Sequence, residues 1–291
     1  MSDQRVIGVD LGGTKILAGV VDRAGNVYET LERPTVTTSQ GALLDELASL
    51  VQELPQQGIG AVGFGVPARV DQKTGIALGA VNIPIRDIEF RGEMAKRLSL
   101  PVGIENDGNA AANAEFTLGA GRDVQGLVML TLGTGVGGGV VIDGRLFRGW
   151  AELGHIVIVE DGEPCQGACS GRGHVEAYCS GRAADKVARR ELGPNATAHD
   201  LVDARHPAVE AIGHHLGVAI GSLVNVFNPE LVVIGGGFGV AAFDLLMPAA
   251  RLAVLTEALA PGGQELAIEA ASLGARAGLI GAALAAFEAL G

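Results

Sequence analysis

Short runs of apolar residues, each bounded by glycines or polar turns, alternate along the chain with longer stripes of helical spacing. A run of about four to eight apolar residues indicates a strand, whereas apolar residues three and four apart indicate a helix. The predicted strands are residues 6–10, 17–21, 59–64, 101–104 and 231–234. The predicted helices are residues 43–54, an alanine-rich stretch ending at Leu118, and residues 176–190, 207–227 and 276–290.

The first two predicted strands are joined by a glycine turn and form a hairpin, which ends at the turn 22–26. This pattern differs from the strand–loop–helix of a P-loop, and the Walker spacing is absent. The hairpin can still hold phosphate, because its glycines expose backbone N–H groups while Thr14 adds a hydroxyl and Lys15 a charge. Asp10 could hold Mg²⁺ through water. The alternative is an ordinary hairpin with a tight turn.

The hairpin recurs later in the chain. A shift of 121 positions places Leu11 on Leu132 and Asp22 on Asp143, and the second copy also carries glycines between its strands. Two unrelated turns would not need to match in this way, so the repeat favours a duplicated fold with phosphates held between the halves. A third glycine segment, 235–237, ends the strand 231–234 and offers another close backbone approach to a nucleotide.

Polar residues follow the strand 101–104, where Glu105, Asn106 and Asp107 open the alanine-rich helix. In an α/β fold, a carboxylate at the end of a strand lies where a base would meet a substrate. The alternative is that Asn106 or Asp107 only caps the helix.

Residues 151–176 bring two glutamates, two histidines and two cysteines into a short span. Thiolate and imidazole groups at such spacings are typical zinc ligands. Glu152 and Glu176 lie on either side of this group and can accept hydrogen bonds from the hydroxyls of a polar ligand. We therefore expect a structural zinc ion beside a sugar-binding surface. The third cysteine, Cys179, is expected in the core.

The composition limits the class of protein. The chain has 291 residues, of which 48% are apolar and 45 are glycine, so we expect a large core and many close backbone approaches. A net charge of −12 argues against nucleic acid or an anionic membrane as a partner. Residues 1–5 are polar and no apolar run reaches the ~20 residues of a membrane helix. We expect a soluble, cytoplasmic protein.

Seven motifs together resemble the ROK family of sugar kinases and sugar-responsive repressors, and within it the glucokinases. They are Asp10-Leu-Gly-Gly-Thr-Lys15, Gly65-Val-Pro67, Glu105-Asn-Asp-Gly-Asn109, Leu132-Gly-Thr-Gly-Val-Gly-Gly-Gly139, Glu152-Leu-Gly-His155, Gly173-His-Val-Glu176 and Gly235-Gly-Gly237. The resemblance covers nearly the whole chain. It implies an actin-like ATPase (ribonuclease H-like) fold, with two duplicated α/β domains around a central cleft. The domains implied are 1–113 with 277–291, and 114–276.

The resemblance also implies roles for single residues. Asp107 corresponds to the general base that takes the proton of a sugar hydroxyl as the hydroxyl attacks the γ-phosphate of Mg-ATP. The implied sugar ligands are Asn106, Asp107, Glu152, His155 and Glu176. The implied ATP-binding residues are Asp10, Gly12, Gly13, Thr14, Lys15, Gly133, Thr134, Gly135, Gly235, Gly236 and Gly237.

The zinc motif departs from the family pattern Cys-x-Cys-Gly-x-x-Gly-Cys-x-Glu. Gly167 stands in place of the first cysteine, Cys165 lies two residues earlier, and His174 replaces the last cysteine. The set His155, Cys165, Cys169 and His174 is still a workable tetrahedral site. We predict that it binds zinc, and that zinc occupancy is coupled to sugar affinity if His155 uses its second nitrogen for a sugar hydroxyl.

The leading function is phosphorylation of a hexose by ATP, with glucose first. Fructose, mannose, N-acetylmannosamine and N-acetylglucosamine remain open as acceptors, and polyphosphate as donor. A sugar-sensing repressor would carry an N-terminal DNA-binding domain, for which the first strand at Val6 leaves no room here. A silent sugar-binding scaffold would not need Asp107. We expect a homodimer or homotetramer from the family.

Overall fold

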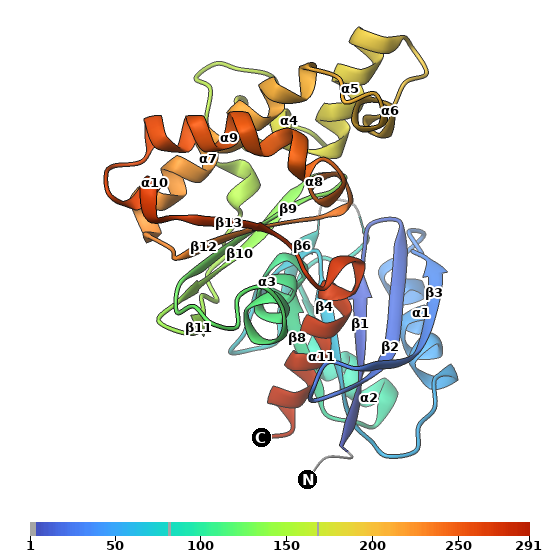
Figure 1. Ribbon diagram of the computed structural model, residues 1–291. Coiled ribbons are helices and arrows are strands. Elements are labelled where there is room, and N and C mark those ends of the chain that lie inside the picture. Colours follow the sequence, from blue (N-terminus) through green and yellow to red (C-terminus); the bar gives the residue numbers. More distant parts are fainter. Residues whose placement is uncertain (1–3, 81–82, 168) are drawn as a thin grey trace. The chain divides into compact units, whose positions relative to one another are not determined.

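The computed structural model describes residues 4–80, 83–167 and 169–291, and the chain groups into two compact units (Figure 1). Unit 1 contains Met1–Leu118, Arg148–Trp150 and Arg276–Gly291, and unit 2 contains Gly119–Phe147 and Ala151–Ala275. Each unit has its own five-stranded sheet. Residues 1–3 of the predicted polar N-terminal segment lie outside the described residues.

The sheet of unit 1 has the strand order β3-β2-β1-β4-β8. Its strands are β1 (Arg5–Leu11), β2 (Lys15–Asp22), β3 (Val27–Pro34), β4 (Ile59–Val66) and β8 (Val102–Asn106). β1, β2 and β3 pair antiparallel, whereas β1, β4 and β8 run parallel. The predicted hairpin is therefore confirmed. Because parallel strands end at the same edge, Asp10 and Asn106 lie at one edge of this sheet.

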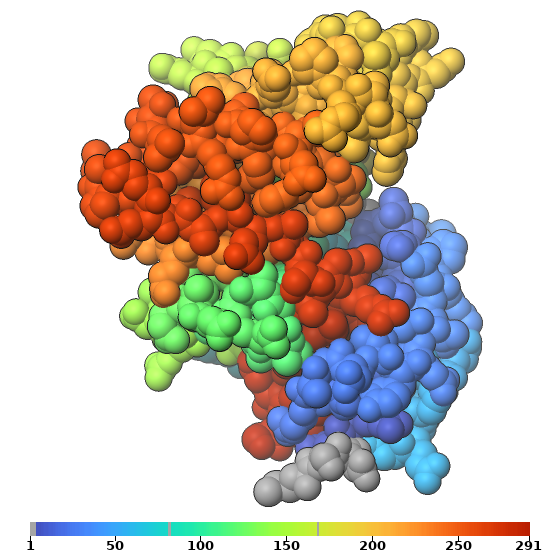
Figure 2. Space-filling view, in the orientation of Figure 1, coloured from blue at the N-terminus to red at the C-terminus, as the bar shows by residue number. Residues whose placement is uncertain are grey.

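Helices cover both faces of this sheet. One face packs on α1 (Gln40–Glu53) and α2 (Phe90–Leu98), through the apolar stripe that predicted the first helix. The other face packs on α11 (Ala277–Ala289), which also contacts α3 (Asp107–Leu118). A Cβ at Gly63 would overlap the carbonyl oxygen of Ala282, so glycine lets α11 lie directly on β4. Figure 2 shows these C-terminal residues, in red, against the blue N-terminal strands.

A small antiparallel sheet of β5 (Ala68–Asp71), β6 (Ile76–Ala80) and β7 (Ile88–Glu89) completes unit 1. The sequence pattern did not predict it. Its strands are short, and β5 and β6 turn sharply at Gly75, which has φ of 76°.

The sheet of unit 2 repeats the plan of the first, in the order β11-β10-β9-β12-β13. Its strands are β9 (Leu127–Leu132), β10 (Val136–Ile142), β11 (Arg145–Leu146), β12 (Leu231–Gly235) and β13 (Ala267–Ala270). β9 and β10 form the second glycine hairpin, and β9, β12 and β13 run parallel. Strand order and directions correspond one to one in the two units. The predicted duplication is confirmed.

The helices of unit 2 are packed mainly around one long helix, α7 (Ala208–Phe227), which lies against α9 (Phe243–Glu257). The others are the short helix η1 (Leu153–His155), α4 (Val175–Cys179), α5 (Gly181–Leu192), α6 (Ala198–Asp203), α8 (Gly237–Ala241) and α10 (Gly262–Glu265). A last short turn, η2 (Gly274–Arg276), precedes α11.

Two sequence predictions need correction. The helix predicted over 176–190 is broken at Ser180 into α4 and α5, because the Ser180 hydroxyl accepts from the N–H of Ala183 and caps the second helix.

Among the described residues α7 is long and apolar enough to span a membrane by length and composition, contrary to the expectation of no such run. About half of that window, 56%, is buried inside the protein, where it packs on α9.

Candidate active site

Asn106 and Asp107 lie at the junction of β8 and α3, where the strand end meets the first turn of the helix. The Asn106 Oδ1 accepts from the N–H of Asn109 at 3.1 Å, as a helix cap does. Its Nδ2 donates to Asp107 Oδ1 at 3.0 Å, and the N–H of Gly108 donates to the same oxygen at 2.9 Å. Asn106 therefore caps the helix and also fixes the orientation of the Asp107 carboxylate.

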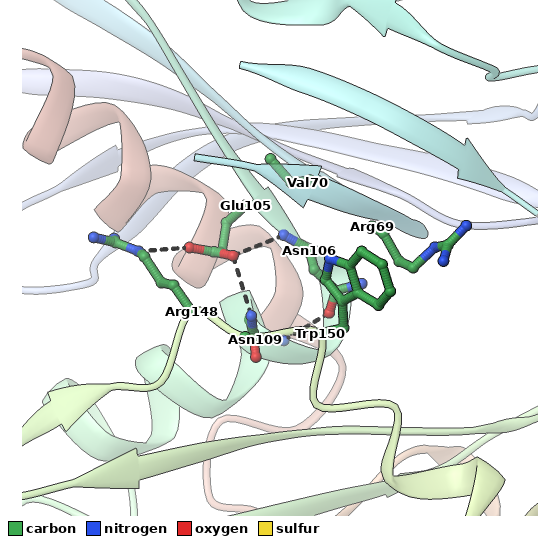
Figure 3. A pocket seen from close by; sticks show the side chains of 8 residues that line it. Arg69, Val70, Glu105, Asn106, Asn109, Arg148 and Trp150 are labelled. Carbon is green, nitrogen blue, oxygen red and sulfur yellow. Dashed lines mark hydrogen bonds and ion pairs between the residues drawn. The ribbon is translucent and has the colours of Figure 1, made fainter. Parts of the chain in front are cut away.

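A buried carboxylate supports this junction from behind. Glu105 is only 3% exposed, and its Oε1 accepts from the N–H of Asn106 at 3.0 Å and from Asn109 Nδ2 at 3.2 Å. Its Oε2 pairs with Arg148 Nε at 3.0 Å (Figure 3). Arg148 also pairs with Glu288. Arg148 was not predicted from the sequence, because its partners Glu105 and Glu288 are brought to it by tertiary structure.

The first glycine hairpin of unit 1 forms a compact turn between β1 and β2. The N–H of Gly12 donates to the Lys15 carbonyl at 2.9 Å, and the Thr35 hydroxyl donates to the Gly12 carbonyl at 2.7 Å. A Cβ at Gly12 would lie 2.8 Å from the Lys15 carbonyl oxygen, so the turn requires a small residue there. Gly13, Thr14 and Lys15 are exposed at its tip. The Lys15 amine pairs with Glu32 at 2.7 Å, and both are exposed, so a phosphate could replace Glu32 at little cost.

Asp10 lies at the end of β1, two strands from Asn106. Burial raises the pKa of Asp10 to about 6, and the nearby charge of Lys15 only partly offsets this. Gly278, in the first turn of α11, lies so close that a Cβ there would overlap the Asp10 carboxylate. The carboxylate is thus held against the start of a helix, at the same sheet edge as Asp107.

The second glycine hairpin, in unit 2, is hydrogen-bonded to the carboxylate of Glu176, a residue of α4. The N–H of Val136 donates to Glu176 Oε2 at 2.9 Å, and a Cβ at Gly135 would overlap that oxygen. The N–H of Gly133 donates to the Gly135 carbonyl at 3.0 Å, and Thr134 is exposed at the tip. The predicted sugar ligand Glu176 and a predicted ATP-binding turn therefore share one hydrogen-bonded group.

The third glycine segment lies beside this hairpin. Gly235 ends β12 opposite Thr131 of β9, and Gly236 has φ of 78° with no room for a side chain against the Leu132 backbone. Gly237 begins α8 and faces open space. The segments 133–135 and 235–237 are thus side by side in unit 2, while 12–15 belongs to unit 1.

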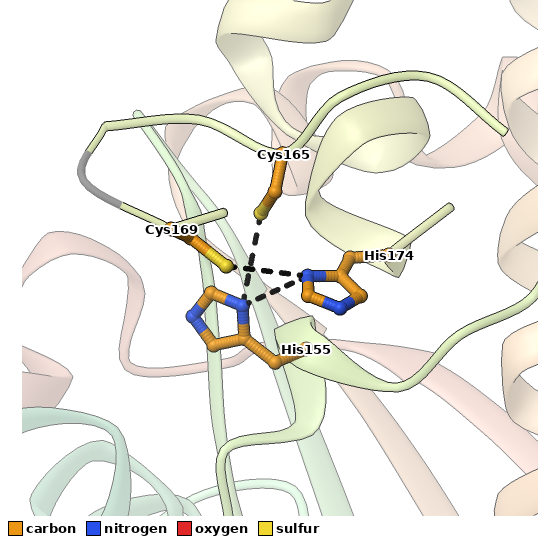
Figure 4. A group of neighbouring side chains, drawn as sticks. All are labelled: His155, Cys165, Cys169 and His174. Carbon is orange, nitrogen blue, oxygen red and sulfur yellow. Dashed lines mark hydrogen bonds between the residues drawn. The ribbon is translucent and has the colours of Figure 1, made fainter. Parts of the chain in front are cut away.

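The predicted zinc ligands converge in unit 2 (Figure 4). His155 ends η1, His174 precedes α4, and Cys165 and Cys169 come from the loop between them. One ligand atom from each of the four lies within 4.8 Å of the others. Glu152 precedes η1, three residues before His155.

The spacing of these atoms agrees with a tetrahedral metal site. The two His Nδ1 atoms are 3.2 Å apart, and each lies 3.7 Å from one cysteine sulfur, His155 with Cys165 and His174 with Cys169. Zinc bonds of about 2.0–2.1 Å to nitrogen and about 2.3 Å to sulfur place such pairs about 3.3 Å and about 3.6 Å apart. Burial raises the pKa of Cys165 to about 11, so binding a metal there must release the thiol proton. Cys179 is fully buried elsewhere, and burial raises the pKa of its thiol as well.

Comparison with known proteins adds family evidence. The family model described as "ROK family" matches residues 6–288. A glucokinase of Streptomyces coelicolor is 35% identical, with 95% of this chain and 96% of that protein covered.

Two solved structures are similar over nearly the whole chain. A ROK family glucokinase from Streptomyces griseus, in complex with glucose and AMPPNP, has a TM-score of 0.85 and 32% identity, with 98% of this chain and 99% of that chain covered. A ROK family transcriptional regulator, a homologue of the E. coli MLC protein, has a TM-score of 0.88 and 26% identity, with 99% of this chain and 78% of that chain covered.

Proposed function

We propose that this chain, which belongs to the ROK family and has the actin-like ATPase fold, transfers the γ-phosphoryl group of ATP to a hexose, with glucose as the first candidate. The observation that carries the proposal is the Asp107 carboxylate, held by Asn106 and Gly108 at a strand end. The similarity to glucokinases over most of the chain supports the same reaction.

In the proposed reaction a sugar hydroxyl attacks the γ-phosphorus of ATP. The new oxygen–phosphorus bond forms, the bond to the ADP oxygen breaks, and the hydroxyl proton passes to Asp107. The two hydrogen bonds on Oδ1 fix the carboxylate so that it need not reorganise during proton transfer. The products are a sugar phosphate, ADP and a proton.

The two glycine hairpins and the segment 235–237 are proposed to hold the nucleotide. Their backbone N–H groups and the exposed Thr14 and Thr134 hydroxyls offer donors for phosphate oxygens. Mg²⁺ bound with ATP would neutralise phosphate charge, and Asp10 is the proposed residue that holds it through water. The sugar would be bound by Asn106, Glu152, His155 and Glu176. The predicted domains, 1–113 with 277–291 and 114–276, remain a prediction, and the compact units of the fold differ from them because residues 114–118, 148–150 and 276 group with unit 1.

We propose that zinc is bound by Nδ1 of His155 and His174 and by the two sulfurs of Cys165 and Cys169. Zinc would supply a structural cross-link for the loop that leads to Glu176. The Nε2 of His155 then remains for a sugar hydroxyl, so loss of zinc should weaken sugar binding. A cytoplasmic location and a homodimer or homotetramer also remain predictions.

A panel assay tests the function. Purified protein with Mg-ATP is offered glucose, fructose, mannose, N-acetylglucosamine and N-acetylmannosamine, and sugar phosphates are identified by mass spectrometry. Glucose 6-phosphate as the main product is expected. If only another sugar is phosphorylated, the kinase proposal stands and the proposed substrate changes. Repeating the assay with polyphosphate in place of ATP tests the phosphate donor.

The second candidate is a sugar-sensing regulator, favoured by the similarity to the ROK transcriptional regulator. A regulator would bind sugar, seen by calorimetry, yet turn over none of the panel with either donor. That result would contradict the kinase proposal.

A further inference from the structure

Trp150 is the only tryptophan of the chain and lies next to the proposed catalytic strand end. Its side chain is 56% exposed, a large apolar surface left in water. The guanidinium of Arg69, on β5, stacks over the indole at 4.5 Å from the ring centroid. The cation–π attraction between the guanidinium and the indole favours this orientation of the ring.

The indole forms one wall of a small pocket in unit 1 (Figure 3). Asn106, which donates to the Asp107 carboxylate, also lines this pocket. Trp150 and the residue that orients the proposed base therefore line the same pocket. Arg69, Asn109, Glu105 and Arg148 complete most of the lining.

The same pocket is lined by a polar side chain whose bonding is incomplete. Asn109 is 3% exposed, and its Nδ2 donates to Glu105. Its Oδ1 is buried and accepts no hydrogen bond from any described residue. A buried acceptor of this kind calls for a donor from a water molecule or a ligand.

The backbone on both sides of Trp150 is fixed. Arg148 is paired with Glu105 and with Glu288, at two separate elements of unit 1. Ala151 has φ of 36°, in the left-handed region that residues with a Cβ rarely adopt. Strain of this kind persists where surrounding contacts hold it, and it is concentrated at functional sites.

We propose that Trp150, held by Arg69, is the aromatic wall of the acceptor site and packs against the C–H face of the pyranose ring. The inference rests on the proposed function and adds to it a residue that determines sugar affinity. An aromatic wall with a few convergent polar groups is the usual composition of a small-molecule site. The sugar hydroxyls, directly or through water, then supply the donor for the buried Asn109 Oδ1.

The test uses the fact that the tryptophan fluorescence of this protein comes from Trp150 alone. D-glucose, or the sugar turned over fastest in the panel, is added to the full-length protein without nucleotide. We expect the emission to change and to saturate at the Kd that calorimetry gives. Trp150→Ala should raise the sugar Kd and KM about tenfold, as loss of a buried aromatic contact does, with the KM for ATP unchanged.

Two variants complete the design. Trp150→Phe keeps a ring at the site and should raise the sugar Kd only about two- to threefold, with an unchanged melting temperature as the check on folding. Phe147→Ala removes another exposed aromatic side chain, 43% exposed, from the same segment but outside the pocket lining. It should leave the sugar Kd unchanged.

Unchanged emission on a sugar that calorimetry shows to bind, together with an unaltered Kd in Trp150→Phe and Trp150→Ala, would overturn this inference and leave the kinase proposal intact. A failure of the wild-type protein to bind or phosphorylate any sugar would instead overturn the proposed function. The two failures are therefore distinguishable.

Discussion

The Glu176 carboxylate accepts a hydrogen bond from the backbone N–H of Val136 at 2.9 Å. Glu176 is the proposed sugar ligand of α4, and Val136 begins β10, directly after the glycine turn proposed for ATP. A proposed sugar-binding group and a proposed nucleotide-binding turn are therefore joined by a hydrogen bond within unit 2. The absence of a side chain at Gly135 makes room for this contact.

Gly135→Ala should displace the Glu176 carboxylate, because the new Cβ would overlap its Oε2. A displacement of about 1 Å in a binding group can cost roughly a hundredfold, so we expect kcat/KM for the sugar to fall by about that factor. The matched control is Gly133→Ala in the same turn, where a Cβ meets nothing within 4 Å. Gly133→Ala should raise the KM for ATP rather than lower kcat/KM for the sugar. Equal sugar effects in both variants would argue against a role for the Glu176 contact.

Removal of zinc should weaken sugar binding. A chelator that strips the metal from the holoprotein is expected to raise the KM for sugar more than the KM for ATP, and to lower the melting temperature. Cys169→Ala should abolish zinc, measured by elemental analysis, whereas Cys179→Ala should retain it, since Cys179 is buried in the core away from the site. An unchanged sugar KM after complete metal loss would disprove the proposed coupling.

Asp10→Asn should stabilise the protein while inactivating it. Burial raises the pKa of Asp10 to about 6 from an ordinary 3.8, so above pH 6 the charged carboxylate destabilises the folded state by up to about 3 kcal/mol. As the pH falls through 6 toward 4, the folded protein binds the proton first, and this penalty disappears. The variant should therefore be more stable than wild type at pH 8, with a gap that closes toward pH 4.

Urea unfolding at several pH values measures this gap. If the difference in unfolding free energy between wild type and Asp10→Asn does not depend on pH, the ionised Asp10 carboxylate does not destabilise the folded state. Wild-type kcat should fall as the pH drops below about 6, because Asp10 is then protonated and the neutral carboxylic acid no longer attracts the hydrated Mg²⁺.

Much of the fold follows from local sequence. The hairpins β1–β2 and β9–β10 were predictable because apolar runs flank glycine turns, and α1 because its leucines recur at helical spacing. β3 was missed because it is mostly exposed along its length, and α2 because its charged residues dilute the apolar face. The break at Ser180 depends on a single capping hydroxyl, which the apolar pattern does not show.

The site divides in the same way. Cysteine and histidine are typical metal ligands and lie close together in this part of the sequence. His155, Cys165, Cys169 and His174 could therefore be predicted from sequence as one metal site. The roles of Arg148 and Trp150 come from contacts about 40 or more positions away in the chain, with Glu105 and Arg69. No local spacing encodes such contacts, so only the folded structure reveals them.

The most direct measurement compares Asp107→Asn with wild type, by kcat with Mg-ATP and by calorimetric sugar Kd on the same preparations. The amide keeps the shape of the side chain but cannot take the hydroxyl proton. Because a general base contributes about 10²–10⁴-fold, we expect kcat to fall by about 10³-fold while the sugar Kd stays within a few-fold of wild type. Near-normal turnover in Asp107→Asn would contradict the assignment of Asp107 as the base in hexose phosphorylation.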